Sequence, residues 1–558
     1  MEAFSSLFSE DFLLEKLIEQ LYFNESDPSV RFLMGLFNDL NKNNDSIKNE
    51  DKSIEEFTKG KQALNKNHNK EALSLFNKAL ITAPGSSKHI VSFYTQRSIA
   101  LQKLKAYSES LNDIERALKL SKTEEEKLEL QKRKKIINSL ILSSDLKNLN
   151  VTEKLFNENN EEISYGESDE LIGVSSAISL KFNEKYGRHY IANQEIKVGD
   201  VLMLQKPFVH TLIPERLSEI FGTAEQLFCD YCLKLILNPI PCENCTSVIY
   251  CTDECKLKSF QKLHDIECQV SRKYPSNGRS LALRSLILAT DKGKNFHEIY
   301  NIMKKIENCK DRTSGFHNGK LDGSKAEAIL SLLTHTDKRM DRMHYFNVAL
   351  VVNVLRKNTD FLKGHATHEN TVKIGNMLLK FSYICQMNVY GIQGKNSRSR
   401  IALAIYPVFN YLNNSCANNA LWYDKKNEKI LRACKNIQKG EQVCVSYMTH
   451  EVVNKTAEER KTFFRTAKFF NCECEACKMN YNFKCELKTR LKIPRQLKTK
   501  LINKPNDTKS LWELLKLVVN EYKGPCLEGK RIEFAIVNAH LGSSNEEVPQ
   551  ILRLLRLL

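Results

Sequence analysis

The sequence lacks the features of a membrane or secreted protein. It contains no run of eighteen apolar residues, so we expect no membrane-spanning helix and no membrane partner. Its start, MEAFSSLFSEDFLLEKLIEQ, carries acidic side chains where a signal peptide needs positive charge and an uninterrupted apolar stretch. The sequence therefore predicts a protein of a reducing intracellular compartment, either cytoplasm or nucleus.

A nucleic-acid-reading pattern is also missing, although the formal net charge is +17. Much of the excess lies between residues 478 and 509, where ten Lys or Arg residues stand against Glu486 and Asp507. This segment is typical of a solvated helix face or a linker, because nucleic-acid binding needs basic charge on one folded face. No helix carries a base-reading pattern of the C2H2 kind, so direct nucleic-acid binding is not expected.

The chain is long and contains many cysteines. A chain of 558 residues, 42% of them apolar, exceeds what one hydrophobic core usually organises and predicts two to four domains. Seventeen cysteines in a reducing compartment indicate metal binding rather than a disulfide framework.

A repeat occupies the region after the first 52 residues. Ala72 and Ala79 recur 38 residues later as Ser110 and Ala117, with the small-residue spacing of a tetratricopeptide helix pair. The first copy contains small residues and a proline at Gly60, Ala63, Ala72, Ala79 and Pro84. Two repeats are few for a stable solenoid. We therefore expect the segment either to lean on the rest of the protein or to bind a partner, with a plain helical hairpin as the alternative.

Eight potential zinc ligands follow one another in the pattern C-x2-C-x9-C-x2-C-x5-C-x3-C-x8-H-x3-C. Structural zinc takes four thiolate or imidazole ligands, so eight ligands predict two ions. The spacing alone does not decide which four residues share an ion. The ligands are Cys229, Cys232, Cys242, Cys245, Cys251, Cys255, His264 and Cys268.

This arrangement resembles the MYND finger, which implies interleaved sites. By that resemblance, one ion is held by Cys229, Cys232, Cys251 and Cys255, and the other by Cys242, Cys245, His264 and Cys268. MYND fingers commonly bind proline-rich peptides, so the finger is either such an interaction module or a scaffold.

Four further fragments resemble the SET methyltransferase pattern. They are Gly187-Arg188-His189, Asn413-Asn414-Ser415-Cys416 with Asn418, Gly440-Glu441 leading to Tyr447, and the trio Cys472, Cys474 and Cys477 after Phe469-Phe470. The resemblance makes Cys416 the fourth ligand of the trio, which implies a third zinc ion. A MYND finger inside a split SET domain, with repeats in front, is similar to the SET and MYND domain-containing proteins, closest to the member-four branch.

The resemblance implies S-adenosylmethionine as cofactor and a protein lysine as substrate. Gly187, Arg188, His189, Asn413, Asn414, Tyr447 and Phe470 would contact the cofactor. Tyr447 would be the catalytic residue, with its hydroxyl orienting the amine, although an ordinary strand tyrosine is the alternative. Asn388 and Lys468 would line the lysine channel, and Asn388 could instead be a polar residue at a helix end.

Two departures from the family pattern leave a second interpretation open. Asn414 stands where the family has histidine, and Lys468 stands where relatives carry a tyrosine of the channel wall. Lys468 would either bring positive charge to the site, which is costly in a dry environment, or turn outward with Phe469 or Phe470 covering the channel. The alternative to a protein-lysine methyltransferase is a weak or inert adaptor that binds partners through its repeats and finger.

The expected fold is an α+β multidomain chain with a helical repeat, a split β-rich core and helical additions. The predicted order is N-terminal helices and linker over 1–52, tetratricopeptide-like repeats over 53–145, the first SET part over 170–228, the MYND finger over 229–268, a helical insert over 269–390, the SET C-terminal core over 391–450, a post-SET zinc segment over 451–480 and a helical region over 481–558.

Overall fold

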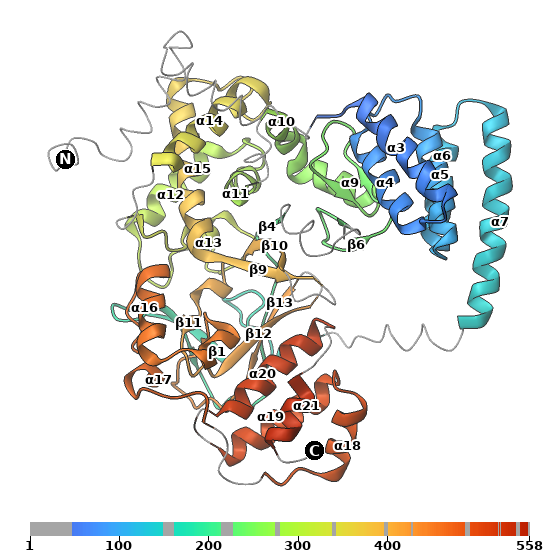
Figure 1. Ribbon diagram of the computed structural model, residues 1–558. Coiled ribbons are helices and arrows are strands. Elements are labelled where there is room, and N and C mark those ends of the chain that lie inside the picture. Colours follow the sequence, from blue (N-terminus) through green and yellow to red (C-terminus); the bar gives the residue numbers. More distant parts are fainter. Residues whose placement is uncertain are drawn as a thin grey trace. The chain divides into compact units, whose positions relative to one another are not determined.

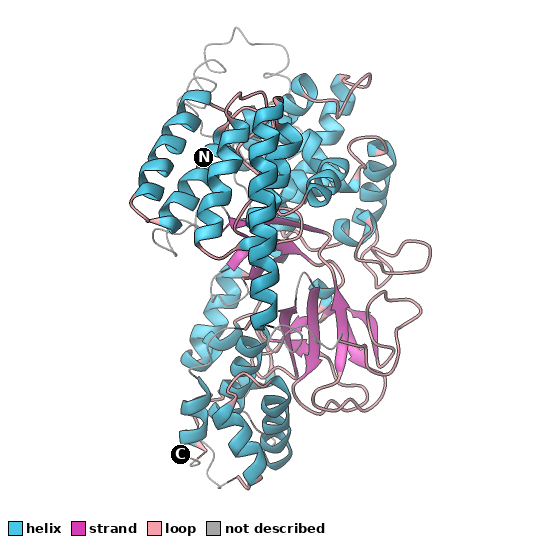
Figure 2. Ribbon diagram, turned by 90° about the vertical axis from the view of Figure 1, so that its right-hand side faces the viewer, coloured by secondary structure: helices cyan, strands magenta, loops and turns pink. Residues whose placement is uncertain are grey.

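The protein is described by a computed structural model that mixes helices and strands, as the sequence predicted (Figure 2). The structure describes residues 47–148, 161–213, 227–273, 280–336, 342–394, 400–425, 428–485, 491–522, 524, 526–542 and 547–555. Of the N-terminal helices and linker predicted over 1–52, residues 1–46 lie outside these ranges. The chain forms two compact units, the first from Met1–Asn160, Thr211–Lys294 and Tyr345–Gly375, the second from Glu161–His210, Asn295–His344 and Asn376–Leu558.

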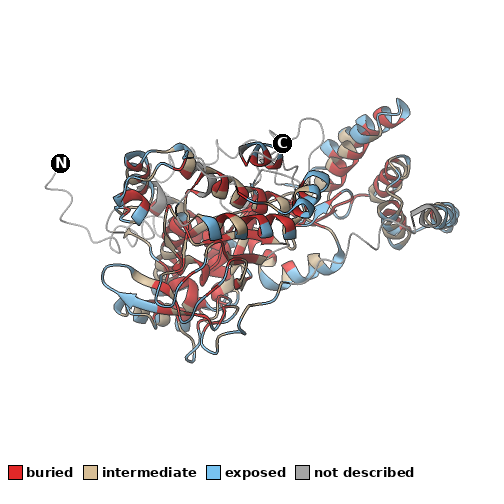
Figure 3. Cartoon of the chain, turned by 90° about the horizontal axis from the view of Figure 1, so that it is seen from below, coloured by how far each residue is buried: buried red, intermediate tan, exposed pale blue. Residues whose placement is uncertain are grey.

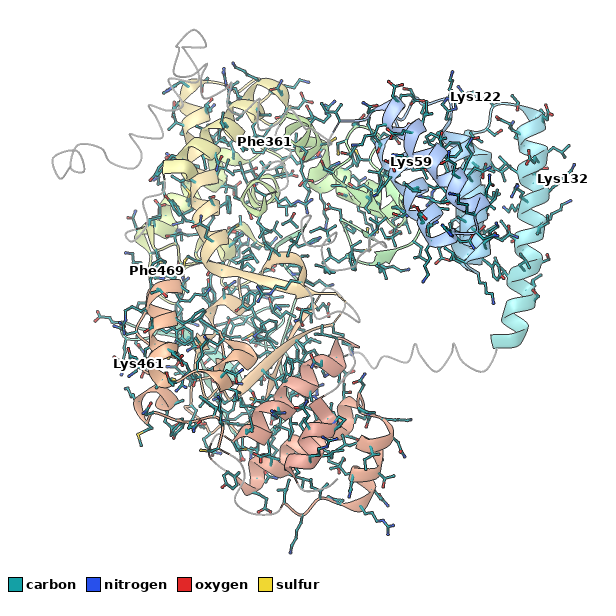
Figure 4. All side chains as sticks on the ribbon, in the orientation of Figure 1. Lys59, Lys122, Lys132, Phe361, Lys461 and Phe469 are labelled. Atoms are coloured by element: carbon teal, nitrogen blue, oxygen red, sulfur yellow. The ribbon has the colours of Figure 1, made fainter. Side chains whose placement is uncertain are left out.

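The first unit begins with a series of antiparallel helices, blue to cyan in Figure 1. Small residues let these helices approach closely, because Ala72, Ala79 and Ala117 are fully buried. A Cβ atom on Gly60 would lie 2.6 Å from the Phe76 ring, so a larger residue would push α3 and α4 apart. The helices are α3 (Glu50–Asn65), α4 (Asn69–Thr82), α5 (Ile90–Lys103), α6 (Tyr107–Leu120) and α7 (Glu124–Asn148). Lys59, Lys122 and Lys132 of this region are labelled in Figure 4.

The cysteine-rich segment of the first unit forms two small hairpins followed by helices. Strands β5 (Leu227–Phe228) and β6 (Leu235–Ile236) pair antiparallel, as do β7 (Ile240–Pro241) and β8 (Ile249–Tyr250). A π-helical turn, η3 (Phe260–His264), interrupts the helical run that follows. The helices are α9 (Asp253–Ser259), α10 (Asp265–Lys273) and α11 (Leu281–Ala289).

Most of the strands belong to the second unit. Strands β1 (Ile178–Asn183) and β2 (Gly187–Ala192) form a hairpin, and β13 (Glu428–Ala433) lies between β12 (Ala420–Lys425) and β3 (Val201–Gln205) in an antiparallel sheet. The short strands β11 (Asn413–Asn414) and β14 (Cys444–Val445) pair in parallel. Strands β9 (Val389–Gln393) and β10 (Arg400–Ile405) pair antiparallel.

A buried charge sits on the β12–β13 pair. The Lys429 side chain is fully buried, and its Nζ lies 2.7 Å from Asp424 Oδ1, its cross-strand neighbour. The same ammonium lies 3.7 Å from the centre of the Trp422 ring and 4.9 Å from that of Tyr406. These contacts compensate the desolvation of a charge that would otherwise not be buried.

Helices of the C-terminal region pack on the sheet of the second unit. Buried Leu511, Trp512 and Leu515 share a core with Leu421 and Ile430 of the sheet. Figure 3 shows the buried faces of the helices in red and the exposed faces in pale blue. The helices of this unit are α12 (Phe296–Asn308), α13 (Ala326–Leu330), α16 (Ala457–Ala467), α17 (Glu475–Lys478), α18 (Arg495–Asn503), α19 (Thr508–Glu521), α20 (Leu527–His540) and α21 (Glu547–Leu554), with the 3-10 turns η5 (Phe409–Tyr411) and η6 (Thr449–Asn454).

Three elements cross the boundary between the two units. They are the strand β4 (Val209–Leu212) and the helices α14 (Arg342–Asn358) and α15 (His368–Asn388). Over residues 269–390, where a helical insert is predicted, the structure describes the end of α10 and the helices α11 through α15, with turns around residues 309–325.

Candidate functional site

The first cluster of metal ligands lies at the start of the cysteine-rich segment. It contains Cys229, Cys232, Cys251 and Cys255, whose sulfur atoms all lie within 4.8 Å of one another. Tetrahedral zinc with Zn–S bonds of about 2.3 Å requires sulfurs about 3.8 Å apart. The Cys251 and Cys255 sulfurs are 3.6 Å apart. The Thr252 side chain caps α9 by accepting from the Cys255 N–H, which fixes the last ligand on the first turn of that helix.

The second cluster is fully buried and contains one histidine. It consists of Cys242, Cys245, His264 and Cys268. The Cys242 and Cys268 sulfurs are 3.8 Å apart, and Cys245 Sγ lies 3.6 Å from His264 Nε2. The π-helical turn that ends at His264 widens the helix locally, as such turns often do at binding sites. The grouping of both clusters is the interleaved one that the resemblance implied.

The orientation of His264 depends on a residue that the sequence analysis missed. Glu267 Oε2 lies 2.9 Å from His264 Nδ1. With the proton on Nδ1 donated to the carboxylate, Nε2 keeps its lone pair for the metal. Burial alone would raise the pKa of Glu267, but Arg284 and His264 outweigh that effect and hold the pKa below its usual value.

Arg284 of α11 contacts acidic residues beside both finger clusters. Its Nε lies 2.5 Å from Glu267 Oε1, and its Nη2 lies 2.8 Å from Asp230 Oδ2. Asp230 follows Cys229 of the first cluster and Glu267 precedes Cys268 of the second. The Arg284 side chain is 1% exposed. The signal that could have revealed it is a single charged residue in the largely apolar helix LALRSLILA.

The third cluster, in the second unit, brings Cys416 to the C-terminal trio. The Cys416 and Cys477 sulfurs are 3.6 Å apart, and all four ligand atoms of Cys416, Cys472, Cys474 and Cys477 lie within 4.8 Å of one another. A capping box between Thr456 and Glu459 starts α16, the helix that leads into the trio. The three clusters therefore offer three complete four-ligand sets of the kind that zinc requires.

The loop predicted to approach the cofactor is the turn of the β1–β2 hairpin. Gly187 has a φ of +61°, and a Cβ atom there would meet no neighbour within 4 Å. Backbone approach by a ligand is therefore unobstructed at this glycine. The neighbouring side chains are engaged within the protein. Arg188 donates to the carbonyls of Ser314 and Ser331 and stacks on the Tyr411 ring, and His189 Nδ1 lies 2.9 Å from the Gly187 carbonyl.

The parallel pairing of β11 with β14 brings two predicted motifs side by side. Asn413 Nδ2 donates to the Tyr186 carbonyl at 3.1 Å. Asn414 Oδ1 accepts the backbone N–H of Tyr447 at 2.9 Å, and its Nδ2 donates to Cys472 Sγ at 3.4 Å. Asn414 thus joins the predicted catalytic tyrosine to a ligand of the third cluster.

The Tyr447 side chain lies in an aromatic environment. Its hydroxyl donates to the Leu412 carbonyl at 2.7 Å, and its ring centre lies 6.4 Å from that of Phe470. Burial raises the pKa of Tyr447, so the phenol stays protonated and its oxygen keeps lone pairs for a ligand. Among the described residues, the buried Ser446 hydroxyl has no hydrogen-bond partner, which leaves a polar group next to Tyr447 for a polar ligand.

The two residues predicted for the lysine channel come together at the end of α15. Asn388 is the last residue of that helix, and its Nδ2 donates to the Leu333 carbonyl at 2.8 Å. Lys468 Nζ donates to the carbonyl of Met387 at 3.1 Å. Phe469, labelled in Figure 4, has a φ of +59° and contacts the His335 ring. The Lys468 ammonium thus points to the backbone beside Asn388.

Comparisons with known proteins show similarity to a zinc-finger family and to several methyltransferases. Residues 229–268 match the MYND finger family. The chain is 28% identical to protein-lysine N-methyltransferase SMYD4 of Mus musculus, over 57% of this chain and 48% of that protein. It is 24% identical to histone-lysine N-methyltransferase ASHR1 of Arabidopsis thaliana, over 55% of each chain. It is 25% identical to N-lysine methyltransferase SMYD2 of Homo sapiens, over 54% of this chain and 61% of that protein.

These matches confirm the resemblance to the SET and MYND domain-containing proteins and to their member-four branch. The chain spans about half the length of the SMYD4 proteins of Mus musculus and Homo sapiens. Within the described residues, none of the helices has the length and apolar character needed to cross a bilayer.

Proposed function

From this relationship to SET and MYND domain-containing proteins, we propose that the chain transfers a methyl group from S-adenosylmethionine to a lysine side chain of a protein. The observation that carries the proposal is the contact of Asn414 with both Tyr447 and Cys472. This contact links the catalytic candidate Tyr447, the cofactor-binding candidate Asn414 and the zinc ligand Cys472. Two observations support ligand binding in the second unit: the Ser446 hydroxyl has no hydrogen-bond partner among the described residues, and the Gly187 turn is open.

The mechanism that we propose relies on positioning. The cofactor would supply an electrophilic methyl group on a sulfonium, which a neutral lysine amine attacks in line. Because the nucleophile is neutral and the leaving group is a good one, the protein has to orient and desolvate the amine rather than act as a strong base. Tyr447, held by Asn414 at its N–H and by Leu412 at its hydroxyl, would direct an oxygen lone pair toward the reacting centre.

Cofactor binding and transfer are tested separately. We expect calorimetric titration of the zinc-loaded chain with S-adenosylmethionine to show micromolar binding, and isotope transfer to candidate proteins to depend on Tyr447. Tyr447→Phe should abolish transfer while leaving the fold intact. Tyr481→Phe is the matched control, since the Tyr481 hydroxyl bonds to Glu475 on the exposed surface. Unchanged transfer by the Tyr447 variant would remove this residue from the mechanism.

The finer architecture is part of the same proposal. We assign α3 through α7 to tetratricopeptide-like repeats, β1–β3 and β9–β14 to the split SET core, and the Cys416 cluster to a post-SET zinc site. The close approach at Gly60 supports the first assignment. The Asn414 contacts support the other two. A proline-rich peptide at the finger, a partner protein at the repeats and a cytoplasmic or nuclear location complete the proposal.

An adaptor without transferase activity is the second candidate. It is favoured by Lys468, whose ammonium bonds to the Met387 carbonyl beside Asn388, where relatives of the resembled family carry a tyrosine. It is also favoured by Arg188, whose guanidinium is engaged by Ser314, Ser331 and Tyr411. Well-folded, zinc-loaded protein that shows no binding of S-adenosylmethionine would select the adaptor.

A further inference from the structure

A tripeptide of the cysteine-rich segment lies against three N-terminal helices of the first unit. Its residues, Leu237, Asn238 and Pro239, lie between Cys232 of the first finger cluster and Cys242 of the second. The Leu237 carbonyl accepts from Asn77 Nδ2 at 3.1 Å, and the Pro239 carbonyl accepts from Arg97 Nη1 at 3.0 Å. Two of the three backbone carbonyls of this tripeptide thus accept hydrogen bonds from side chains of α4 and α5.

The middle residue of the tripeptide contacts the third helix. Asn238 Nδ2 donates to the Glu109 carbonyl at 3.1 Å and lies 3.3 Å from Asp113 Oδ1. Asn238 is 6% exposed. Three consecutive finger residues therefore have hydrogen-bond partners on α4, α5 and α6, which satisfies the polar groups that this contact buries.

Arg97 is the centre of this contact. Its side chain is fully buried and forms a two-pronged ion pair with Asp113, with Nε 2.7 Å from Oδ2 and Nη2 2.8 Å from Oδ1. Its remaining Nη1 is shared between Asn77 Oδ1 and the Pro239 carbonyl. The ion pair fixes the guanidinium before the finger arrives, so little side-chain entropy is lost when Pro239 binds.

We propose that the N-terminal helices act as a receptor for the finger, with residues 237–239 as its ligand, and that this docking retains zinc in both finger clusters. The tripeptide connects the two clusters. Fixing its position therefore holds the Cys229–Cys232 pair and the Cys242–Cys245 pair at a constant distance and orientation. Metal binding provides much of the folding free energy of a small zinc module. Docking and zinc retention therefore stabilise each other, and the face around Arg97 is taken by the chain itself rather than by an external partner.

The test is zinc release from the full, zinc-loaded chain into a chelating metal indicator. The variants are Arg97→Lys, which keeps a charge for Asp113 but cannot reach Asn77 and Pro239 together, and Asn238→Ala on the finger side. For Arg97→Lys we expect two of three zinc equivalents to leave about ten-fold faster, since a buried carbonyl without its donor changes an equilibrium by roughly that factor. The third equivalent, in the second unit, should keep its rate and serves as an internal reference.

Two further comparisons make the result decisive. Combining Arg97→Lys with Asn238→Ala should accelerate release by less than the product of the single effects, because both variants disrupt one contact. Lys134→Ala is the control, since Lys134 pairs with Glu115 at 2.8 Å within the helical region and not with the finger. Wild-type release rates in both the Arg97 and the Asn238 variants would overturn the proposal, as would equal acceleration of all three equivalents.

Discussion

Asn414 accepts the backbone N–H of Tyr447 at 2.9 Å, and this contact connects the catalytic candidate to the third metal cluster. The other end of the same amide donates to Cys472 Sγ. Asparagine offers an acceptor and a donor at fixed separation, so it can serve both neighbours at once. Its presence where the resembled family has histidine is therefore compatible with an ordered site.

Removing the side-chain amide of Asn414 should weaken both methyl transfer and zinc binding by the third cluster. We expect Asn414→Ala to lower methyl transfer and zinc affinity of the third cluster by about 10- to 100-fold, the usual effect of losing a hydrogen bond to a metal ligand. Transfer is measured with labelled cofactor and zinc affinity by chelator competition. Gln438→Ala, at an exposed position, is the control. Loss of transfer with unchanged zinc affinity would show that the Cys472 contact contributes nothing to the metal site.

Zinc stoichiometry tests the third cluster directly. Elemental analysis of the purified chain should return three zinc ions, and Cys416→Ser should return two, because three thiolates do not complete a structural site. Cys485→Ser is the control, since Cys485 is an exposed cysteine outside the three clusters. Two ions in the wild-type chain would show that the third cluster is not a zinc site.

Much of this organisation could be predicted because its signals are local. The ligands of each finger cluster occur at short spacings, and small residues such as Ala72 and Ala79 mark where helices approach closely. The β-rich core was predicted over 170–228 and 391–450 through the family resemblance, and strands lie in both regions. Cys416 stands far from its trio and was found through the family resemblance alone.

Buried charges could not be predicted from the sequence. Arg97, Arg284 and Lys429 are all fully or almost fully buried, although charged residues are usually exposed. Arg284 and Arg97 are buried with partners that lie far away in the sequence, Asp230 for Arg284 and Pro239 for Arg97, whereas Lys429 pairs with Asp424 across its own hairpin. A sequence pattern gives the residue type but not the long-range pairing that makes its burial favourable.

Arg284 should control the stability of both finger clusters. Arg284→Met should leave Asp230 and Glu267 as uncompensated buried carboxylates, a loss of about 3–5 kcal/mol. We therefore expect faster zinc release from two of three sites and a lower midpoint of thermal unfolding in the first unit. Arg272→Met is the control, because Arg272 is exposed on the neighbouring helix α10. Unchanged zinc release would show that Arg284 only supports the helix packing.

The burial of His540 predicts that the second unit becomes less stable against unfolding at acidic pH. Its ring stacks on Tyr423 with centres 3.6 Å apart, and burial lowers the pKa of His540 to about 3. An unfolded histidine has a pKa near 6.5. Between these values the unfolded state binds more protons, so stability is complete above about pH 6.5 and falls with decreasing pH by up to about 1.4 kcal/mol per pH unit.

The measurement is the urea midpoint at pH 7 and pH 5, followed by fluorescence of the two tryptophans, Trp422 and Trp512. Both lie in the second unit. His540→Phe keeps an aromatic ring without the titration and should reduce the loss of stability between the two pH values. His68→Gln, an exposed histidine of the first unit, should not. Equal losses in all three proteins would exclude His540 as the acid-sensitive group.

We predict that the charge of Lys468 weakens binding of a sulfonium at the proposed site. Its Nζ is directed to the Met387 carbonyl, on the residue before Asn388 of the predicted lysine channel. Two positive charges about 8 Å apart repel by roughly 2 kcal/mol at an effective dielectric constant of about 20. We therefore expect Lys468→Tyr to tighten S-adenosylmethionine binding about ten-fold and to raise the transfer rate.

The control for this change lies on α16, the helix that ends directly before Lys468. Lys461→Tyr makes the same change of charge and size within α16 and should leave cofactor binding unchanged. Equal tightening by both variants would show that the effect comes from the lower net charge and not from the position of Lys468. Calorimetric titration gives the affinity and labelled cofactor gives the rate. Weaker binding by the Lys468 variant would mean that the ammonium supports the cofactor site through the Met387 backbone. In that case the lysine would replace structurally the tyrosine of the resembled family, and its positive charge would not account for weak methyl transfer.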